Sequence, residues 1–218
     1  MSGFNPTCNL FVSRFSMKST IIDLIRHGEP VGGRRYRGRT DDPLSEKGWN
    51  QMRSAVGDYR GWQQIVSSPL LRCSEFAHEL GRKLDIPVSM DERLAELGYG
   101  EWEGKTPAEL TAHDPDLLLR YRRDPLGNRP LGAEEIEGFA ARVSTAWAQI
   151  IEQQRGRHVL VVAHAGVIRM IMAQALSMPL SHLFRIQVGN AAISRFAVEG
   201  EGGDAFASLI FHDGRLVP

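Results

Sequence analysis

Two short apolar segments, each followed by a histidine, constrain the fold of this chain more than any other feature. Residues 20–25 (TIIDLI) precede Arg26 and His27, and residues 158–163 (HVLVVA) precede His164. Runs of this length, rich in β-branched residues and stopped by a nearby glycine, predict strands. Because both runs are apolar almost throughout, we expect them to be central strands of a sheet with helices on both faces.

Helix and strand patterns alternate along most of the remaining chain. The expected elements are a helix over residues 45–59, a strand over 64–67, a helix over 73–84 with Ser68 as its N-cap, a strand over 87–90, short helices within 91–130, helices over 136–151 and from 166, and an edge hairpin of 193–198 with 205–211. This order predicts an α/β fold with three layers, α/β/α. Its central sheet is expected to be mostly parallel with an antiparallel edge.

Composition argues against several classes of partner. The 26 Lys and Arg balance the 26 Asp and Glu, so no basic field favours nucleic acid. No stretch approaches the roughly 18 apolar residues that a membrane span needs. Two cysteines are too few for a disulfide framework and indicate a reducing, cytoplasmic location. We expect a single domain over residues 19–218, after a flexible extension of residues 1–18.

The two histidines predict a ligand site because they occupy matching positions. His27 and His164 each follow the carboxyl end of a predicted strand, and open α/β sheets bind their ligands at that edge. A single histidine at a strand end is most often a structural residue. Two on matched ends, one of them preceded by an arginine, favour a shared site instead.

Two arginines and one carboxylic acid complete a predicted phosphate site. Arg26 adjoins His27, and Arg72 lies in the segment SSPLLRC after the second strand. Guanidinium groups match phosphate oxygens and keep their charge at any working pH. Glu96 lies in a segment rich in glycine and aromatic residues, from which a carboxylic acid can donate a proton to a leaving oxygen.

Five segments in this order resemble the histidine phosphatase superfamily, also called the phosphoglycerate-mutase-like family. The segments are RHGE (26–29), GRTDDPLSEKGWNQ (38–51), SSPLLRC (67–73), ERLAELGYGEWEG (92–104) and VVAHAGVIR (161–169). The tripeptide RHG alone can arise by chance, but five ordered segments are a specific signal. The resemblance covers about residues 20–198.

The resemblance implies a metal-independent phosphatase that needs no cofactor. It assigns the role of nucleophile to His27 and the phosphate pocket to Arg26, Arg72 and His164. It assigns the protonation of the leaving group to Glu96. Together these residues imply hydrolysis through a phosphohistidine.

The expected substrate is a small soluble phosphomonoester. Residues 183–198 look most like the α-ribazole phosphatases of cobalamin synthesis, so α-ribazole 5′-phosphate is a candidate. The loop after the first histidine departs from the family, because Pro30 replaces the usual Thr or Ser. The residues expected to shape selectivity are Arg34, Arg35, Tyr36, Arg37 and Trp102.

Two alternatives stay open. A phosphoglycerate-type mutase of this family carries a longer insertion between the donor acid and the second histidine than the 68 positions (164 − 96) that separate Glu96 from His164. A non-catalytic phosphate-binding protein on the same fold would have lost a pocket residue, and none is lost. A homodimer is a candidate assembly of the protein under each of these interpretations.

Overall fold

A computed structural model describes residues 19–200, 202 and 205–216, and the expected N-terminal extension over residues 1–18 lies outside them. A six-stranded sheet in the order β3-β2-β4-β1-β5-β6 forms its centre. The strands are β1 (Thr20–Arg26), β2 (Gln64–Ser67), β3 (Val88–Met90), β4 (His158–Ala163), β5 (Ile193–Glu199) and β6 (Phe206–Gly214).

The sheet is parallel from β3 to β1 and antiparallel at its other edge. β1 pairs in parallel with β4, so that Arg26 lies opposite Ala163. β2 is parallel to both β4 and β3, whereas β5 is antiparallel to β1 and β6 to β5. The predicted fold class, including its antiparallel edge, is therefore confirmed. Because β1 and β4 are neighbours, the two histidines that follow them emerge at the same edge.

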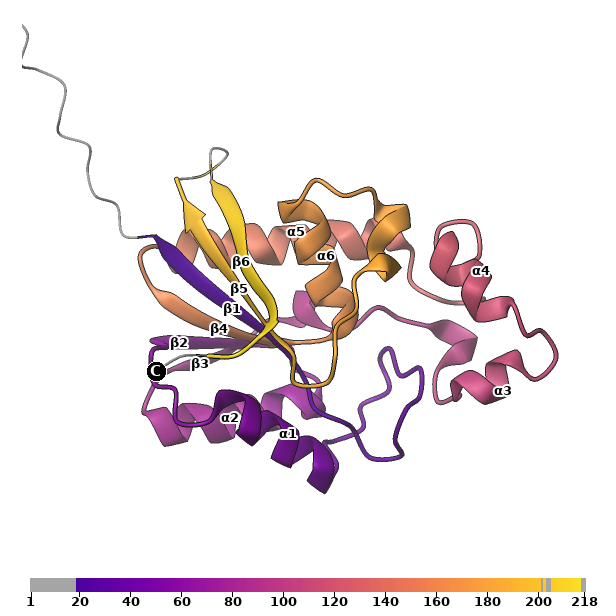
Figure 1. Cartoon of the computed structure of the whole chain (residues 1–218), viewed down its shortest axis with the longest axis horizontal. Coiled ribbons are helices and arrows are strands. Elements are labelled where there is room, and N and C mark those ends of the chain that lie inside the picture. Colours follow the sequence, from indigo (N-terminus) through magenta and orange to yellow (C-terminus); the bar gives the residue numbers. More distant parts are fainter. Residues whose placement is uncertain (1–18, 201, 203–204, 217–218) are drawn as a thin grey trace, which may run out of the picture.

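Helices cover both faces of the sheet (Figure 1). The covering helices are α1 (Glu46–Val56) and α2 (Leu71–Leu84) on one face, and α5 (Ile136–Gln153) and α6 (Ala165–Ala175) on the other. The side chains of β1 alternate between the two cores: Ile22 and Leu24 pack toward α5 and α6, and Ile25 packs toward α1 and α2. Burial on both sides explains why the strand is apolar almost throughout.

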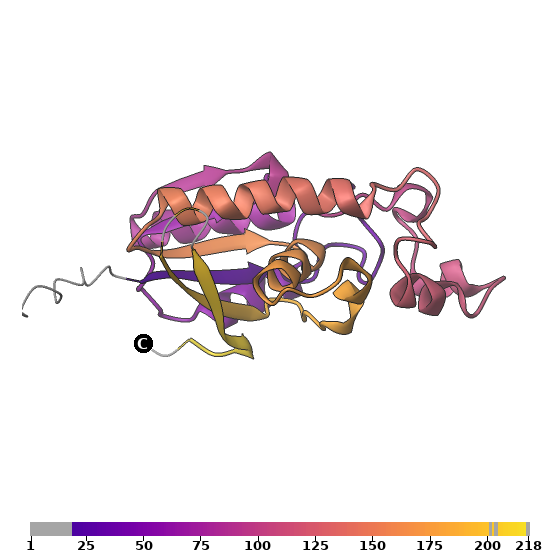
Figure 2. The ribbon, with the colours of Figure 1, turned by 90° about the horizontal axis from the view of Figure 1, so that it is seen from above.

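Short helices fill the region between β3 and α5 and the segment after α6. They are η1 (Glu92–Leu94), η2 (Gly100–Trp102), α3 (Pro107–Thr111), α4 (Leu117–Arg123) and η3 (Leu180–Arg185). Figure 2 shows α3 and α4 standing beyond the carboxyl ends of the strands. Tyr121 of α4 is buried against Trp102 and Phe184, with ring centroids 5.0 and 4.9 Å away. In the part of the chain that the structure describes, no helix is long and apolar enough to cross a membrane.

The start of α2 differs from the prediction. The helix begins at Leu71, and Ser68 is not its N-cap. The carboxylate of Asp41 accepts a hydrogen bond from the Leu71 amide at 2.7 Å, so a distant loop satisfies one of the free N–H groups that a cap would otherwise serve. The Ser68 hydroxyl lies instead 2.7 Å from the ring of His164.

A buried ionic group occupies the middle of β1. The Asp23 carboxylate is fully buried and accepts hydrogen bonds from Arg195 at 2.7 and 2.9 Å and from the Trp62 indole at 2.8 Å. His158 lies 2.9 Å from the same carboxylate. Burial acts to raise the pKa of Asp23, but the hydrogen bonds from Arg195, His158 and Trp62 outweigh it and lower that pKa. A charge buried this deeply depends on keeping its partners.

Candidate active site

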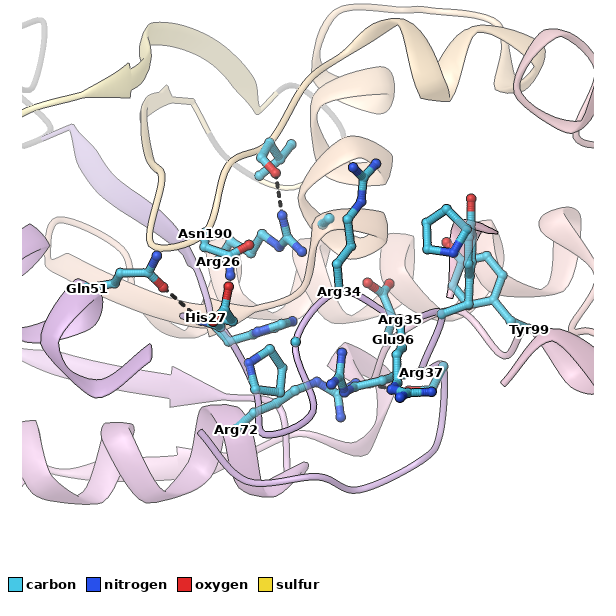
Figure 3. Close-up of a pocket in the computed structure, with 18 of the residues that line it drawn as sticks. Arg26, His27, Arg34, Arg35, Arg37, Gln51, Arg72, Glu96, Tyr99 and Asn190 are labelled. Carbon is cyan, nitrogen blue, oxygen red and sulfur yellow. Dashed lines mark hydrogen bonds between the residues drawn. The ribbon is translucent and has the colours of Figure 1, made fainter. Parts of the chain in front are cut away.

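A cavity of about 400 Å³ lies at the carboxyl end of β1 (Figure 3). Its volume falls within the range of roughly 300–1,000 Å³ that is usual for small-ligand pockets. The walls come from the loop after β1, α2, the segment around Glu96, α6 and residues 187–190. The side chains discussed below that line it are Arg26, His27, Arg34, Arg35, Tyr36, Arg37, Arg72, Glu96 and Arg169.

The imidazole of His27 is held with one nitrogen free. Its Nδ1 lies 2.7 Å from the carbonyl oxygen of Gly28, a contact that places the proton on Nδ1 and leaves the lone pair on Nε2. Burial, with the charges of Arg26 and Arg72, holds the pKa of His27 well below its usual value. The ring is therefore neutral at neutral pH, in the state that a nucleophile requires.

Two glycines let the loop that carries His27 pass close to helix α1. A Cβ atom at Gly28 would lie 2.2 Å from the Gly48 carbonyl oxygen, and one at Gly48 would lie 2.1 Å from the Glu29 carbonyl oxygen. Gln51 adds a further tie, because its side-chain oxygen accepts a hydrogen bond from the Glu29 amide at 2.8 Å. Backbone contact thus requires glycine within the RHGE motif.

Arg26, which is half-buried, and Arg72, which is buried, provide positive charge beside His27. Arg26 donates to the Val188 carbonyl at 2.7 Å, and Arg72 donates to the carbonyls of Thr40 and Gly38 at 2.8 and 2.9 Å. Within the described residues, the Nε atoms of both arginines are buried without an acceptor. Burial lowers the pKa of Arg26 to about 10, so it stays charged at neutral pH. A buried donor without an acceptor costs about 1–3 kcal/mol, and a bound anion would remove that cost.

His164 lies directly behind His27. The two ring centroids are 5.2 Å apart in an edge-on arrangement, and His164 is fully buried. Its Nε2 lies 2.7 Å from the Ser68 hydroxyl and 3.6 Å from the Cys73 sulfur. Burial and the charge of Arg72 hold the pKa of His164 well below its usual value. The rings meet, as matched strand ends predict, but His164 is not among the residues that line the cavity, and phosphate binding by His164 stays a prediction.

The carboxylate of Glu96 sits at the N-terminus of α6. Its two oxygens accept hydrogen bonds from the Gly166 amide at 3.1 and 3.2 Å, and one also accepts from the Leu97 amide at 2.9 Å. The partial positive charge of a helix N-terminus stabilises a carboxylate in this position. A Cβ atom on Gly166 would lie only 2.3 Å from Glu96 Oε1, so the glycine makes room for the acid.

Arg142 of α5 positions the segment that carries Glu96. Its guanidinium donates to the carbonyls of Arg93 and Ala95 at 2.7 Å and to that of Glu96 at 3.0 Å. A second set of hydrogen bonds joins it to Glu134 at 2.6 and 2.8 Å. Sequence reasoning missed this residue, because an arginine on an amphipathic helix normally indicates a solvated surface.

Glu103 connects the segment that carries Glu96 to the loop that holds Arg72. Its carboxylate accepts hydrogen bonds from the amides of Tyr99, Arg39 and Thr40, at 3.0–3.1 Å. Since the Thr40 carbonyl in turn accepts from Arg72, Glu103 fixes one of the two carbonyls that orient this arginine. It was also missed, because no local pattern marks it.

The residues expected to shape selectivity divide into two groups. Arg34, Arg35, Tyr36 and Arg37 line the cavity, and Trp102 does not. Trp102 is buried behind Tyr36, with ring centroids 5.3 Å apart. Arg37 is bound to Asp42 at 2.8 Å. Any effect of Trp102 on substrate choice would therefore pass through Tyr36.

Comparison with known families and proteins agrees with the resemblance in sequence. The profile of the histidine phosphatase superfamily (branch 1) matches residues 22–207. The Bifunctional protein Rv2228c of Mycobacterium tuberculosis is 36% identical over 180 residues, which make up 80% of this chain and 49% of that protein. The chain thus spans about half the length of that relative. Glucosyl-3-phosphoglycerate phosphatase of Mycobacterium tuberculosis is 31% identical over 207 residues, covering 88% of this chain and 92% of the relative.

Solved structures share the fold. The mycobacterial glucosyl-3-phosphoglycerate phosphatase Rv2419c, in complex with VO3, superposes with a TM-score of 0.77 at 29% identity, covering 88% of this chain and 97% of that one. A putative α-ribazole-5′-P phosphatase from Escherichia coli has a TM-score of 0.76 at 24% identity, covering 92% and 98%. The second likeness supports the fold alone.

Proposed function

Since the chain belongs to the histidine phosphatase superfamily, we propose that it hydrolyses a small soluble phosphomonoester through a phosphohistidine at His27. One observation carries the proposal. A neutral, oriented imidazole lies beside the guanidinium groups of Arg26 and Arg72, whose buried Nε atoms have no acceptor among the described residues. The imidazole supplies the attacking nitrogen, and the two guanidinium groups supply hydrogen-bond donors for a tetrahedral anion.

In the first step, the Nε2 lone pair of His27 attacks phosphorus in line with the leaving oxygen. A P–N bond forms, the P–O bond breaks, and its electron pair goes to the leaving oxygen, which takes a proton from Glu96. Arg26, Arg72 and His164 would hold the other phosphate oxygens.

In the second step, water attacks the phosphohistidine. Glu96, now a carboxylate, takes a proton from that water, the P–N bond breaks, and its electron pair returns to Nε2 of His27. The contact between Nδ1 and the Gly28 carbonyl keeps the ring oriented throughout. Each step uses only side chains of this chain and water.

The alternative within the family is a mutase, in which phospho-His27 returns its phosphoryl group to the bound product. The 68 positions from Glu96 to His164 (164 − 96) contain α3, α4 and α5, which leaves little chain for a further cover over the cavity. We therefore favour hydrolysis. With 3-phosphoglycerate, phosphate release should be faster than formation of 2-phosphoglycerate, and the reverse order would establish the mutase.

Two esters are the first to test as substrates. α-Ribazole 5′-phosphate follows from the resemblance of residues 183–198 to α-ribazole phosphatases. Glucosyl-3-phosphoglycerate follows from the named activity of a relative that is 31% identical. Phosphate release from one of these at a kcat/KM well above that for p-nitrophenyl phosphate would identify the preferred ester.

The test of the proposed chemistry is steady-state hydrolysis by His27→Gln, with His78→Gln as its control. His78 is exposed on α2 and does not line the cavity. We expect His27→Gln to lose at least about 1,000-fold in kcat and His78→Gln to match the wild type. Full activity in His27→Gln would refute the nucleophile. An absence of hydrolysis in the wild type, with phosphate esters still bound, would establish the non-catalytic alternative.

A further inference from the structure

The cavity is lined by more arginines than are needed to bind one phosphate group. Among the residues that the structure describes, six arginines line it, and the carboxylates in the lining are those of Glu29 and Glu96. Arg35 and Arg37 face carboxylates of their own, Glu109 at 3.9 Å and Asp42 at 2.8 Å, outside that lining. Glu29 is paired with Lys47 at 3.0 Å. The four remaining arginines are Arg26, Arg34, Arg72 and Arg169.

Resting on the proposed function, we infer that Arg169 and Arg34 form a second anion subsite, which recognises a carboxylate or a second phosphate on the leaving group of the substrate. Arg26 and Arg72 lie beside His27 and serve the phosphate that reacts. Arg169 and Arg34 line the same cavity from α6 and from the loop after β1. The structure therefore favours a doubly anionic ester over one whose alcohol is neutral.

Arg169 is already oriented for such a role. It is half-buried, its Nε donates to the Ile186 carbonyl at 2.8 Å, and its guanidinium lies 5.3 Å from the ring centroid of Phe184. Among the residues that the structure describes, no acceptor is bonded to its terminal nitrogens and no carboxylate lies within 4.0 Å of them. A fixed guanidinium loses little side-chain entropy when it binds a planar anion.

Arg34 lines the same cavity from the loop after β1. Figure 3 shows its side chain extending from the loop after β1 toward the ribbon of α6. Within the described residues it makes no hydrogen bond and no ion pair. Burial raises the pKa of the Tyr36 hydroxyl, and the charges of Arg122, Arg34 and Arg169 oppose that rise, so Arg34 and Arg169 both act on this hydroxyl. Because Arg34 is exposed, its contribution should be the smaller of the two.

Matched pairs of esters test the inference. One pair is 3-phosphoglycerate and glycerol 3-phosphate, which differ by a carboxylate, and the other is fructose 1,6-bisphosphate and fructose 6-phosphate, which differ by a phosphate. In the wild type we expect kcat/KM to be at least about tenfold higher for the more charged member of one pair, as one charge-assisted hydrogen-bonded contact supplies. The pair that shows the preference identifies the anion.

Variants assign the preference to its residues. Arg169→Gln should lower the ratio of kcat/KM between charged and neutral members by about tenfold, and Arg34→Gln by about threefold. Arg82→Gln, which removes a charge from the exposed side of α2 away from the cavity, should leave the ratio unchanged. Equal turnover of both members by the wild type, or an equal loss on both members in Arg169→Gln, would overturn the inference while the phosphatase activity stands. Phosphate release from no ester at all would instead overturn the proposed function, and the inference with it.

Discussion

Adding one methyl group to Gly166 should disable the proton donor without unfolding the protein. A Cβ atom there would lie 2.3 Å from Glu96 Oε1, and real Cβ contacts are not shorter than 3.0 Å. The carboxylate must therefore move by about 0.7 Å or more in Gly166→Ala. The clashing atom is the end of a flexible side chain, so we expect the free energy of unfolding to change by less than about 1 kcal/mol.

The loss of activity should depend on the leaving group. A displacement of about 1 Å at a catalytic group costs on the order of 100-fold in rate. In the first step, only leaving groups that need a proton depend on Glu96, whereas the second step depends on it for every ester. We expect the rate constant for phosphohistidine formation from an alkyl phosphate such as glycerol 3-phosphate to fall by about 100-fold in single-turnover measurements. For p-nitrophenyl phosphate, whose leaving group departs as a stable anion, the fall should be less than about tenfold.

A matched glycine provides the control. Gly138 lies in α5, and a Cβ atom there would meet nothing within 4 Å. Gly138→Ala should keep full activity on both esters and gain about 0.5–1 kcal/mol of stability, as glycine-to-alanine changes inside helices do. Equal losses in the rate of phosphohistidine formation from the alkyl and nitrophenyl esters in Gly166→Ala would refute the assignment of Glu96 as proton donor.

Three further predictions concern buried ionisable groups. Asp23→Asn should destabilise the fold by about 3–5 kcal/mol at neutral pH, since Arg195 would keep a charge without its partner. Because the pKa of Asp23 is lowered in the folded protein, its stabilising contribution is present above the unfolded pKa of about 3.9 and is lost as the pH falls below that value. Denaturant melts in which the wild type and Asp23→Asn keep a constant difference in free energy of unfolding down to about pH 2 would contradict this. Cys73, whose pKa burial raises to about 12, should resist iodoacetamide in the native protein at about pH 8, and peptide mapping that finds it alkylated would refute the prediction. His27 should still accept a phosphoryl group at about pH 5.5, after correction for ionisation of the ester; a loss with a midpoint near 6.5 would mean that its pKa is unperturbed.

Local sequence patterns were sufficient to predict the central strands of the sheet and the edge of the sheet at which the site lies. The β-branched runs before His27 and His164 predicted β1 and β4 within one residue of their observed ends, because strands buried on both faces need such residues. The parallel pairing of these strands then places the two rings side by side. The order of strands, by contrast, depends on contacts between distant segments.

Residues that act through distant backbone groups could not be predicted from local pattern. Arg142 binds carbonyls that lie 46–49 positions away in the chain, and Glu103 binds the amides of Arg39 and Thr40, which lie 64 and 63 positions away. Their own neighbourhoods resemble a solvated helix and a polar loop. Ser68 was predicted to cap α2, but the fold uses Asp41 for the first amide of that helix. The prediction for Trp102 failed for the same reason. The segment around it does contribute to the site, but Tyr36 lies between Trp102 and the cavity.

Trapping the phosphorylated intermediate tests the central claim most directly. Wild-type protein would be mixed with a phosphomonoester, quenched in alkali to preserve phosphohistidine, and mapped by mass spectrometry of its peptides. We predict one phosphoryl group on His27, formed at least as fast as the ester turns over. Turnover with no phosphoryl group on His27, or with the group on another residue, would contradict the account.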